Sequence, residues 1–360
     1  MRSTKYILLS VLSGVMLFGM MISCKKNSAS QNYNPDKTAL KAKIDSLTAV
    51  SGATVEGTKP GQYIPGAKEA LDSVIKLAQE VYTSTNYSQE QVMNALGNLQ
   101  RAGEAFSTQL LQEVSKENLV GYWKFNGNSN DSSGHNNNGL LKTNWTGSST
   151  AIVDGGILPQ LVADRFGNAA SAYSFDKGAT IEVPYTNDLN PKSMTICLWI
   201  KTDVISNGGD YMFAIRRWMG YKLNLQTSNF LYFTVYRSGT DNNYFMDDDG
   251  GSASQVPLGT WVQAAVTYDN ANSVAKFYLN GALVKTDLNK VGPPITLSTP
   301  YNITIGNEMP KSKYNITDSN DPDYYYGPDY FIGALDDVRF YNAALSDNDI
   351  LSIYTEEKTP

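Results

Sequence analysis

One carboxylate stands out in the stretch FIGALDDVRFYNAAL at residues 331–345. The alternation of this stretch is typical of a β-strand, and a strict period of two puts Asp336 on the same face as Val338 and Phe340. Asp337 then points to the opposite face. A buried carboxylate without a partner is costly, so it needs a cation or several hydrogen-bond donors. The pattern therefore predicts a cationic or donor-rich partner for Asp336.

A second group of residues has the chemistry of sugar recognition. Two alternating stretches, 221–226 and 230–236, predict neighbouring strands whose leucines, Phe233 and Val235 face the core. Their other faces, with the residues just before them, carry rings and planar hydrogen-bonding groups: Arg216, Trp218, Lys222, Asn224, Gln226, Tyr232 and Tyr236. Sugars stack on rings through their C–H faces and hydrogen-bond through their hydroxyls. The alternative is ordinary cross-strand Tyr–Thr pairing on a solvated sheet, and both interpretations stay open.

Aromatic residues on the long loops could extend the same surface. Trp145, Tyr244 and the run Tyr324–Tyr326 lie outside the predicted strands. The acidic run 247–249 is followed by two glycines and could be a second metal loop, a ligand contact or a solvated turn.

The loop NGNSNDSSGHNNNG, which runs from Asn126 to Gly139, is rich in oxygen donors. Asp131 and Ser133 are its central candidates, because calcium takes six to eight oxygen ligands in sites of this kind. The alternative is a loop of Asx turns that holds no ion.

Composition argues against several classes of function. The chain has one histidine, His135, and two cysteines, which argues against most serine, cysteine and zinc hydrolases. A retaining glycosidase needs two carboxylates about 5 Å apart, and no strand carries a pair of glutamates with that spacing. The sequence pI of about 5.0 argues against nucleic acid as a partner. We therefore predict a protein without catalytic activity.

The N-terminus has the pattern of a lipoprotein signal peptide at residues 1–23. Arg2 and Lys5 precede a low-polarity run, which ends in the tetrapeptide MISC. This tetrapeptide resembles a bacterial lipobox, so we expect lipidation at Cys24, a tether over 24–35 and a place in the cell envelope, at the outer membrane of a Gram-negative bacterium. Lysines rather than acids follow the cysteine, which leaves the leaflet open. The alternative is an uncleaved N-terminal anchor.

The remaining elements position these residues. Residues 36–115 show three amphipathic helical stripes and resemble FIVAR-type modules, small helical units of bacterial surface proteins. Their role is a spacer or a contact with sugar or cell wall. From 117 to 356 the period becomes two, and Asn280-Gly281 predicts a tight hairpin turn. Ser346 is expected to begin a short final helix.

The order of motifs in this second part is similar to laminin G-like domains of the concanavalin A-like superfamily. It runs GYWKFNGNSNDSSGHNNNG, RFGNAASAYSFDKGATIEVP, SMTICLWIKTD, WVQAAVTYDNANSVAKFYLNGALV, ITIGNE and FIGALDDVRFYNAALSDNDI. The resemblance implies a mainly β fold, a two-sheet antiparallel jelly-roll sandwich over 117–356. It also implies that the loop at Asn126–Gly139 meets the start of the last strand, so that Asp131, Ser133 and Asp336 share one structural Ca²⁺.

We therefore predict a membrane-anchored lipoprotein whose sandwich binds a polysaccharide or other glycan. The alternatives are an adhesion module that binds a protein and, with less support, a glycoside hydrolase.

Overall fold

The structure, a computed structural model, describes residues 33–114, 116–236, 245–272, 274–288, 297 and 300–360, but not the side chains of 245–249. The predicted signal peptide at 1–23 and Cys24 lie outside these residues. Two compact units emerge: one comprises residues up to 49 with 72–102, and the other comprises 50–71 with 103–360. None of the described helices is both long and apolar enough to cross a membrane.

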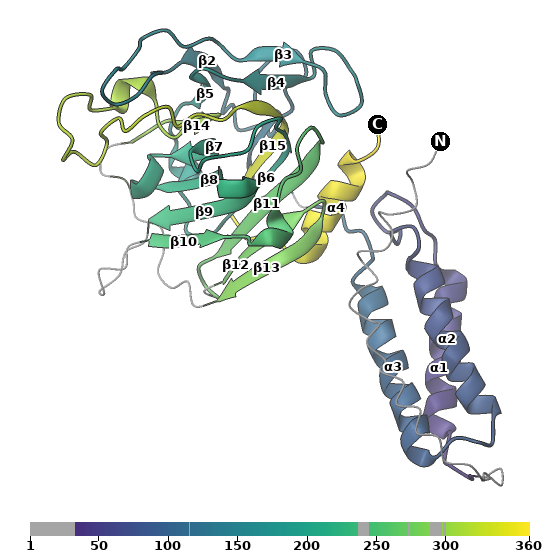
Figure 1. Cartoon of the computed structure of the whole chain (residues 1–360). Helices are drawn as coiled ribbons and strands as arrows, with labels where there is room; N and C mark the ends of the chain where they lie inside the picture. Colours follow the sequence, from purple (N-terminus) through teal and green to yellow (C-terminus); the bar gives the residue numbers. More distant parts are fainter. Residues whose placement is uncertain (1–32, 115, 237–244, 273, 289–296, 298–299) are drawn as a thin grey trace. The chain divides into compact units, whose positions relative to one another are not determined.

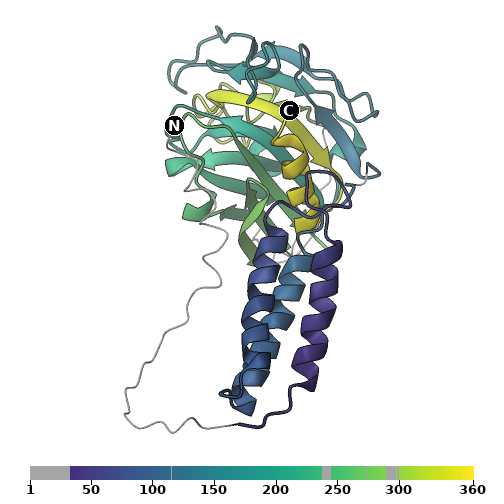
Figure 2. The ribbon, with the colours of Figure 1, turned by 90° about the vertical axis from the view of Figure 1, so that its right-hand side faces the viewer.

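Three helices supply most of the first unit: α1 (Thr38–Ala53), α2 (Ala67–Thr83) and α3 (Gln89–Ser107). Within this unit they lie alongside one another (Figure 2). Each contributes to a buried apolar stripe, represented by Leu40, Ile75 and Leu99. Ser88 and Gln91 exchange hydrogen bonds at the start of α3, which makes a capping box.

Two antiparallel sheets form a sandwich in the second unit (Figure 1), as the sequence predicts. The first has the order β13-β12-β11-β6-β15-β4-β3, with β1 paired to β15, and the second has the order β10-β9-β8-β7-β14-β5-β2. The strands are β1 (Leu119–Trp123), β2 (Leu140–Thr143), β3 (Gln160–Val162), β4 (Ala172–Phe175), β5 (Ala179–Val183), β6 (Met194–Lys201), β7 (Asp210–Ile215), β8 (Tyr221–Gln226), β9 (Phe230–Tyr236), β10 (Phe245–Asp249), β11 (Val262–Asp269), β12 (Val274–Leu279), β13 (Ala282–Leu288), β14 (Ile303–Ile305) and β15 (Gly333–Tyr341).

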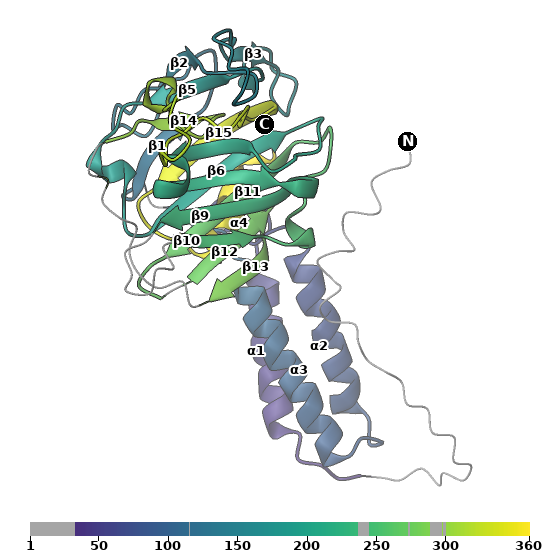
Figure 3. The same ribbon diagram turned by 60° about the vertical axis from the view of Figure 1, so that its left-hand side comes forward.

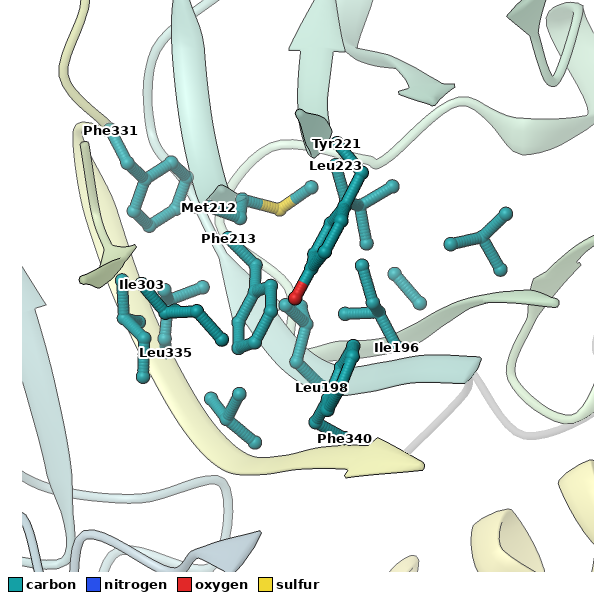
Figure 4. Close-up of a cluster of buried hydrophobic side chains, with 14 of the residues drawn as sticks. Ile196, Leu198, Met212, Phe213, Tyr221, Leu223, Ile303, Phe331, Leu335 and Phe340 are labelled. Atoms are coloured by element: carbon teal, nitrogen blue, oxygen red, sulfur yellow. The ribbon is translucent and has the colours of Figure 1, made fainter. Parts of the chain in front are cut away.

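Aromatic and branched side chains from both sheets fill the space between them (Figure 4). Tyr221 and Phe213 of the second sheet stack on Phe340 of the first, with ring centroids 5.7 and 5.5 Å away. The Tyr221 hydroxyl donates to the Leu189 carbonyl, so burial leaves this polar group satisfied. This core fixes the two sheets on which the candidate sites are built.

The C-terminal helix α4 (Asp347–Glu357) packs on the outer face of the first sheet through Ile350 and Ile353 (Figure 3). Ser346 caps it with a full capping box, as expected. The predicted hairpin turn is also confirmed, because Asn280 and Gly281 have φ values of 50° and 75° between β12 and β13.

The last strand differs from the strict alternation expected for it. A β-bulge lies between Asp336 and Arg339, where Asp337 adopts a left-handed φ of 45°. Leu335, Val338 and Phe340 face the core, whereas Asp336 pairs with Trp199 and faces outward. The prediction that Asp336 shares a face with Val338 was therefore wrong, because the extra residue of the bulge shifts the alternation.

Candidate functional site

The predicted sugar-binding residues lie mainly on β8 and β9, which pair as expected. Lys222 is opposite Thr234, and Asn224 is opposite Tyr232, on the side of the second sheet that faces away from the core. Leu223, Leu225, Leu231, Phe233 and Val235 belong to the core cluster. The strand pairing and the inward faces are thus confirmed.

The centre of this face is covered rather than open. Lys222, Asn224 and Thr234 are each 0% exposed, whereas Trp218 and Tyr232 are half-buried. The Lys222 ammonium lies 3.3 Å from the Trp218 ring centroid, 4.8 Å from that of Tyr211 and 5.6 Å from that of Tyr232. Contact with three rings stabilises a buried cation. The rings of Trp218, Tyr211 and Tyr232 therefore surround the Lys222 ammonium.

A long segment between β14 and β15, drawn in yellow-green in Figure 1, supplies much of this polar region. A bridge between Asn307 and Tyr330 closes its two ends. Glu308, just inside that bridge, is 0% exposed and accepts hydrogen bonds from Tyr314 and Arg217. The sequence placed Tyr324–Tyr326 outside the predicted strands but gave no sign that this segment contributes buried charges.

Two consecutive arginines hold this segment. Arg216 and Arg217 have φ values of 50° and 41°, a left-handed conformation that is costly for residues with a Cβ atom. Arg216 pairs with Asp323 through its Nε and Nη2 atoms, both 3.2 Å from a carboxylate oxygen. Its guanidinium carbon lies 4.7 Å from the Tyr301 ring centroid. In this conformation Arg216, predicted to contact the ligand, is an internal partner of Asp323.

Arg217 reaches further along the same segment. Its Nη1 lies 3.0 Å from Glu308 Oε1, and its Nη2 donates to the carbonyls of Pro322 and Tyr324 at 2.8 and 2.9 Å. The guanidinium carbon is 5.3 Å from the centroid of the Tyr326 ring. Arg217 was not among the predicted residues, although its position beside Arg216 and before Trp218 could have suggested it.

Burial dominates the electrostatics of this region. It raises the pKa of Glu308 to about 7, although Arg217 opposes the shift. It also raises the pKa of Asp329 to about 6, against the pull of Arg217 and Lys222. The Glu308 Oε2 and Asn224 Oδ1 atoms have no hydrogen-bond partner among the described residues. Because of these two pKa shifts, the carboxyls of Glu308 and Asp329 change charge near neutral pH.

The accessible rings lie on the segment itself. Tyr326 is 57% exposed, and its ring meets that of half-buried Tyr324 edge-on, with centroids 5.1 Å apart. Tyr325 points inward, where its hydroxyl donates to the Gly147 carbonyl. We call Tyr324 and Tyr326 the tyrosine platform. Two rings held edge to face, one of them exposed, can stack on the C–H face of a sugar.

The partner of Asp336 is Arg165. Arg165 Nη1 lies 2.6 Å from Asp336 Oδ2, and its Nη2 lies 2.8 Å from Asp337 Oδ2. The same guanidinium donates to the Glu357 carbonyl and stacks 4.4 Å from the centroid of the Trp199 ring. Burial, together with the nearby Asp337, raises the pKa of Asp336 to about 8. The bulge thus turns both aspartates to one guanidinium, and not to opposite faces as expected.

Asp131 is satisfied within its own loop. One carboxylate oxygen accepts the Tyr122 and Ser133 amides at 2.9 and 2.8 Å, and the other accepts the Ser133 hydroxyl and the Asn137 amide at 2.8 and 3.0 Å. Ser133 also donates to the Val120 carbonyl. This is the pattern of an Asx turn.

Calcium does not fit these donors, because Asp131 faces N–H and O–H groups and Asp336 faces a guanidinium. No group of three or more His, Cys, Asp or Glu side chains in the described part of the chain is placed to hold a metal ion. The calcium site stays a prediction.

Comparisons with known proteins agree with this architecture. Residues 175–351 match the family model described as the concanavalin A-like lectin/glucanases superfamily, so the chain carries a domain of that superfamily in this range. No curated protein matches the sequence.

Several solved structures resemble the chain. Domain 4 of AbnA, a GH43 extracellular arabinanase from Geobacillus stearothermophilus solved with arabinotriose, has a TM-score of 0.46 and 18% identity, covering 66% of this chain and 98% of that one. The receptor-binding domain of botulinum neurotoxin mosaic serotype C/D has a TM-score of 0.46 and 16% identity, covering 68% and 52%. The binding domain of Paraclostridial Mosquitocidal Protein 1 has a TM-score of 0.45 and 17% identity, covering 66% and 52%. The chain spans about half the length of the last two.

Proposed function

We propose that this concanavalin A-like domain binds a neutral glycan without cleaving it, and that a lipid on Cys24 keeps it at the cell envelope. The observation that carries the proposal is the tyrosine platform, a ring pair in which Tyr326 is exposed and lies against the Arg217 guanidinium. Side-chain contacts of this kind lose little conformational entropy when a sugar stacks on them.

Charge next to the platform favours a neutral ligand. The Tyr326 hydroxyl contacts the carbonyl of Ser319, which follows the exposed Asp318. Hydrogen bonds from Asn315 and from the Asp323 amide hold the pKa of Asp321 below its usual range, so that this carboxylate is ionised at neutral pH. Asp318 and Asp321 belong to the segment that carries the rings, and negative charges on this segment repel uronates and sulfated sugars.

The buried carboxyls argue for binding rather than hydrolysis. A glycosidase needs an acid and a second carboxylate that both reach the sugar. Glu308 is fully buried against Arg217, and Asp336 is covered and paired with Arg165. None of these groups is accessible in this conformation, which supports a protein without catalytic activity.

A binding experiment with purified protein tests the proposal. Isothermal titration against neutral glucans, mannans and arabinans, with alginate and polygalacturonate as anionic comparisons, should detect a neutral ligand. Tyr326→Ala should weaken binding about fivefold, since one stacked ring contributes about 1 kcal/mol. Tyr33→Ala removes another exposed tyrosine, 37% accessible, and is the matched control. Equal affinity of both variants for the ligand would reject the platform, and release of sugar products would reject the absence of catalysis.

A protein partner is the second candidate. Ile157, Leu158 and Leu161 at the edge strand β3 are 40, 45 and 39% exposed, and such edges can pair with a strand from another chain. Leu161→Lys would abolish binding at this edge and leave glycan binding unchanged. This variant separates the two functions.

A further inference from the structure

The two left-handed arginines meet the same segment at separate points. Arg216 pairs with Asp323, whereas Arg217 bonds the carbonyls on either side of it, those of Pro322 and Tyr324. Strained backbone of this kind persists where its surroundings over-determine it, and it is concentrated at functional sites. Here the turn directs two guanidinium groups at three consecutive residues just before Tyr326.

We propose that Arg217 is a positioning residue for the sugar site: its guanidinium, fixed by Glu308, holds the backbone at 322–324 and thereby orients the tyrosine platform. This inference rests on the proposed function. Arg217 itself is 2% exposed and does not touch the ligand. It acts through the rings, because it supports the backbone of Tyr324 and lies behind the ring of Tyr326.

The geometry of the guanidinium explains why arginine is required. Its planar fork bonds Glu308 on one nitrogen and two carbonyls on another, all between 2.8 and 3.0 Å. Lysine keeps the charge but cannot keep these directions at once. Arg217→Lys therefore removes the hydrogen bonds that hold the segment but keeps the positive charge. Glu308→Gln removes the carboxylate that pairs with Arg217 but keeps an oxygen acceptor in its place.

Arg165→Lys is the matched control. Arg165 is also buried, also bonds both carboxylate and carbonyl groups, and holds β15 to α4 on the outer face of the first sheet. It should lower the melting temperature to a comparable extent and leave glycan affinity unchanged. This control distinguishes local positioning from general loss of stability.

Two measurements on the full chain test the proposal: hydrogen exchange of peptides from 311–330, and affinity for the neutral glycan found with the wild type. We expect Arg217→Lys to speed exchange in that segment alone and to weaken binding by up to about fivefold, no more than Tyr326→Ala does, with a smaller effect for Glu308→Gln. Because Arg217 acts through the rings, Arg217→Lys should weaken binding no further when combined with Tyr326→Ala.

Outcomes that contradict the role of Arg217 differ from those that contradict glycan binding. Unchanged exchange in 311–330 would overturn the positioning role, as would additive losses in the double variant or unchanged affinity despite faster exchange. A wild type that binds no glycan would instead remove the proposed function, and the exchange data would still decide whether Arg217 holds the segment.

Discussion

Replacing Arg165 by alanine should strongly destabilise the sandwich. The side chain is 8% exposed and makes four hydrogen bonds or ion pairs, to Asp336, to Asp337 and twice to the Glu357 carbonyl. Its loss leaves the Asp336 carboxyl, which is 3% exposed, without a cation. Removing one partner of such a buried pair costs about 3–5 kcal/mol.

That cost corresponds to a large thermal shift. For a domain of this size, 1 kcal/mol changes the melting temperature by about 2–4 °C, so Arg165→Ala should lower it by about 6–20 °C. Differential scanning calorimetry of wild type and variant, each with and without EDTA, measures the effect. Lys142→Ala, at an exposed position on β2, should change it by less than about 2 °C.

The same experiment decides between arginine and calcium as the partner of Asp336. If Arg165 is the partner, EDTA leaves the wild-type melting temperature unchanged. A small effect of Arg165→Ala together with a drop in EDTA that added calcium reverses would refute the reasoning, and would support the calcium site expected from Asp131, Ser133 and Asp336.

Three further predictions concern separate parts of the chain. Burial raises the pKa of Glu308 from 4.5 to about 7, so its contribution to stability is full below pH 4.5 and is lost as pH rises through 7. In urea denaturation, the free energy of unfolding of the wild type should therefore fall by about 3 kcal/mol relative to that of Glu308→Gln over this range, and parallel pH curves for the two proteins would contradict this. Gly306 has φ +86°, and an added Cβ would lie 2.2 Å from the Phe175 ring. Gly306→Ala should therefore lower the free energy of unfolding, measured by chemical denaturation, by about 2–4 kcal/mol. An unchanged free energy of unfolding would show that the ring can move. Cys24→Ser should shift the protein from the membrane to the soluble fraction on fractionation, and unchanged membrane association would exclude lipidation as the sole anchor.

Local patterns account for what could be predicted from the sequence. The alternation in β8 and β9 identifies their core faces, Asn280-Gly281 determines a hairpin and Ser346 begins α4. Each depends on residues that are neighbours in the sequence, where periodicity and turn chemistry act.

The candidate site depended on contacts that local patterns do not encode. Nothing near Arg165 indicates that it meets Asp336, and the bulge beside Asp336 changes which face the acid occupies. The strand pattern identified Lys222 as polar and outward, but it could not show that the residue is covered. Tyr326 is accessible whereas Tyr325 is buried, and the sequence pattern alone did not distinguish the two rings.

The position of β15 has a consequence for biosynthesis. This strand lies between β6 and β4 and also pairs with β1, the first strand of the sandwich, although it is the last to be made. The first sheet thus lacks a central member until residue 341 has left the ribosome, and contacts so distant in sequence form slowly. The sandwich of residues 117–356 therefore closes only after its last strand has been made, so this part of the chain cannot complete its fold before then.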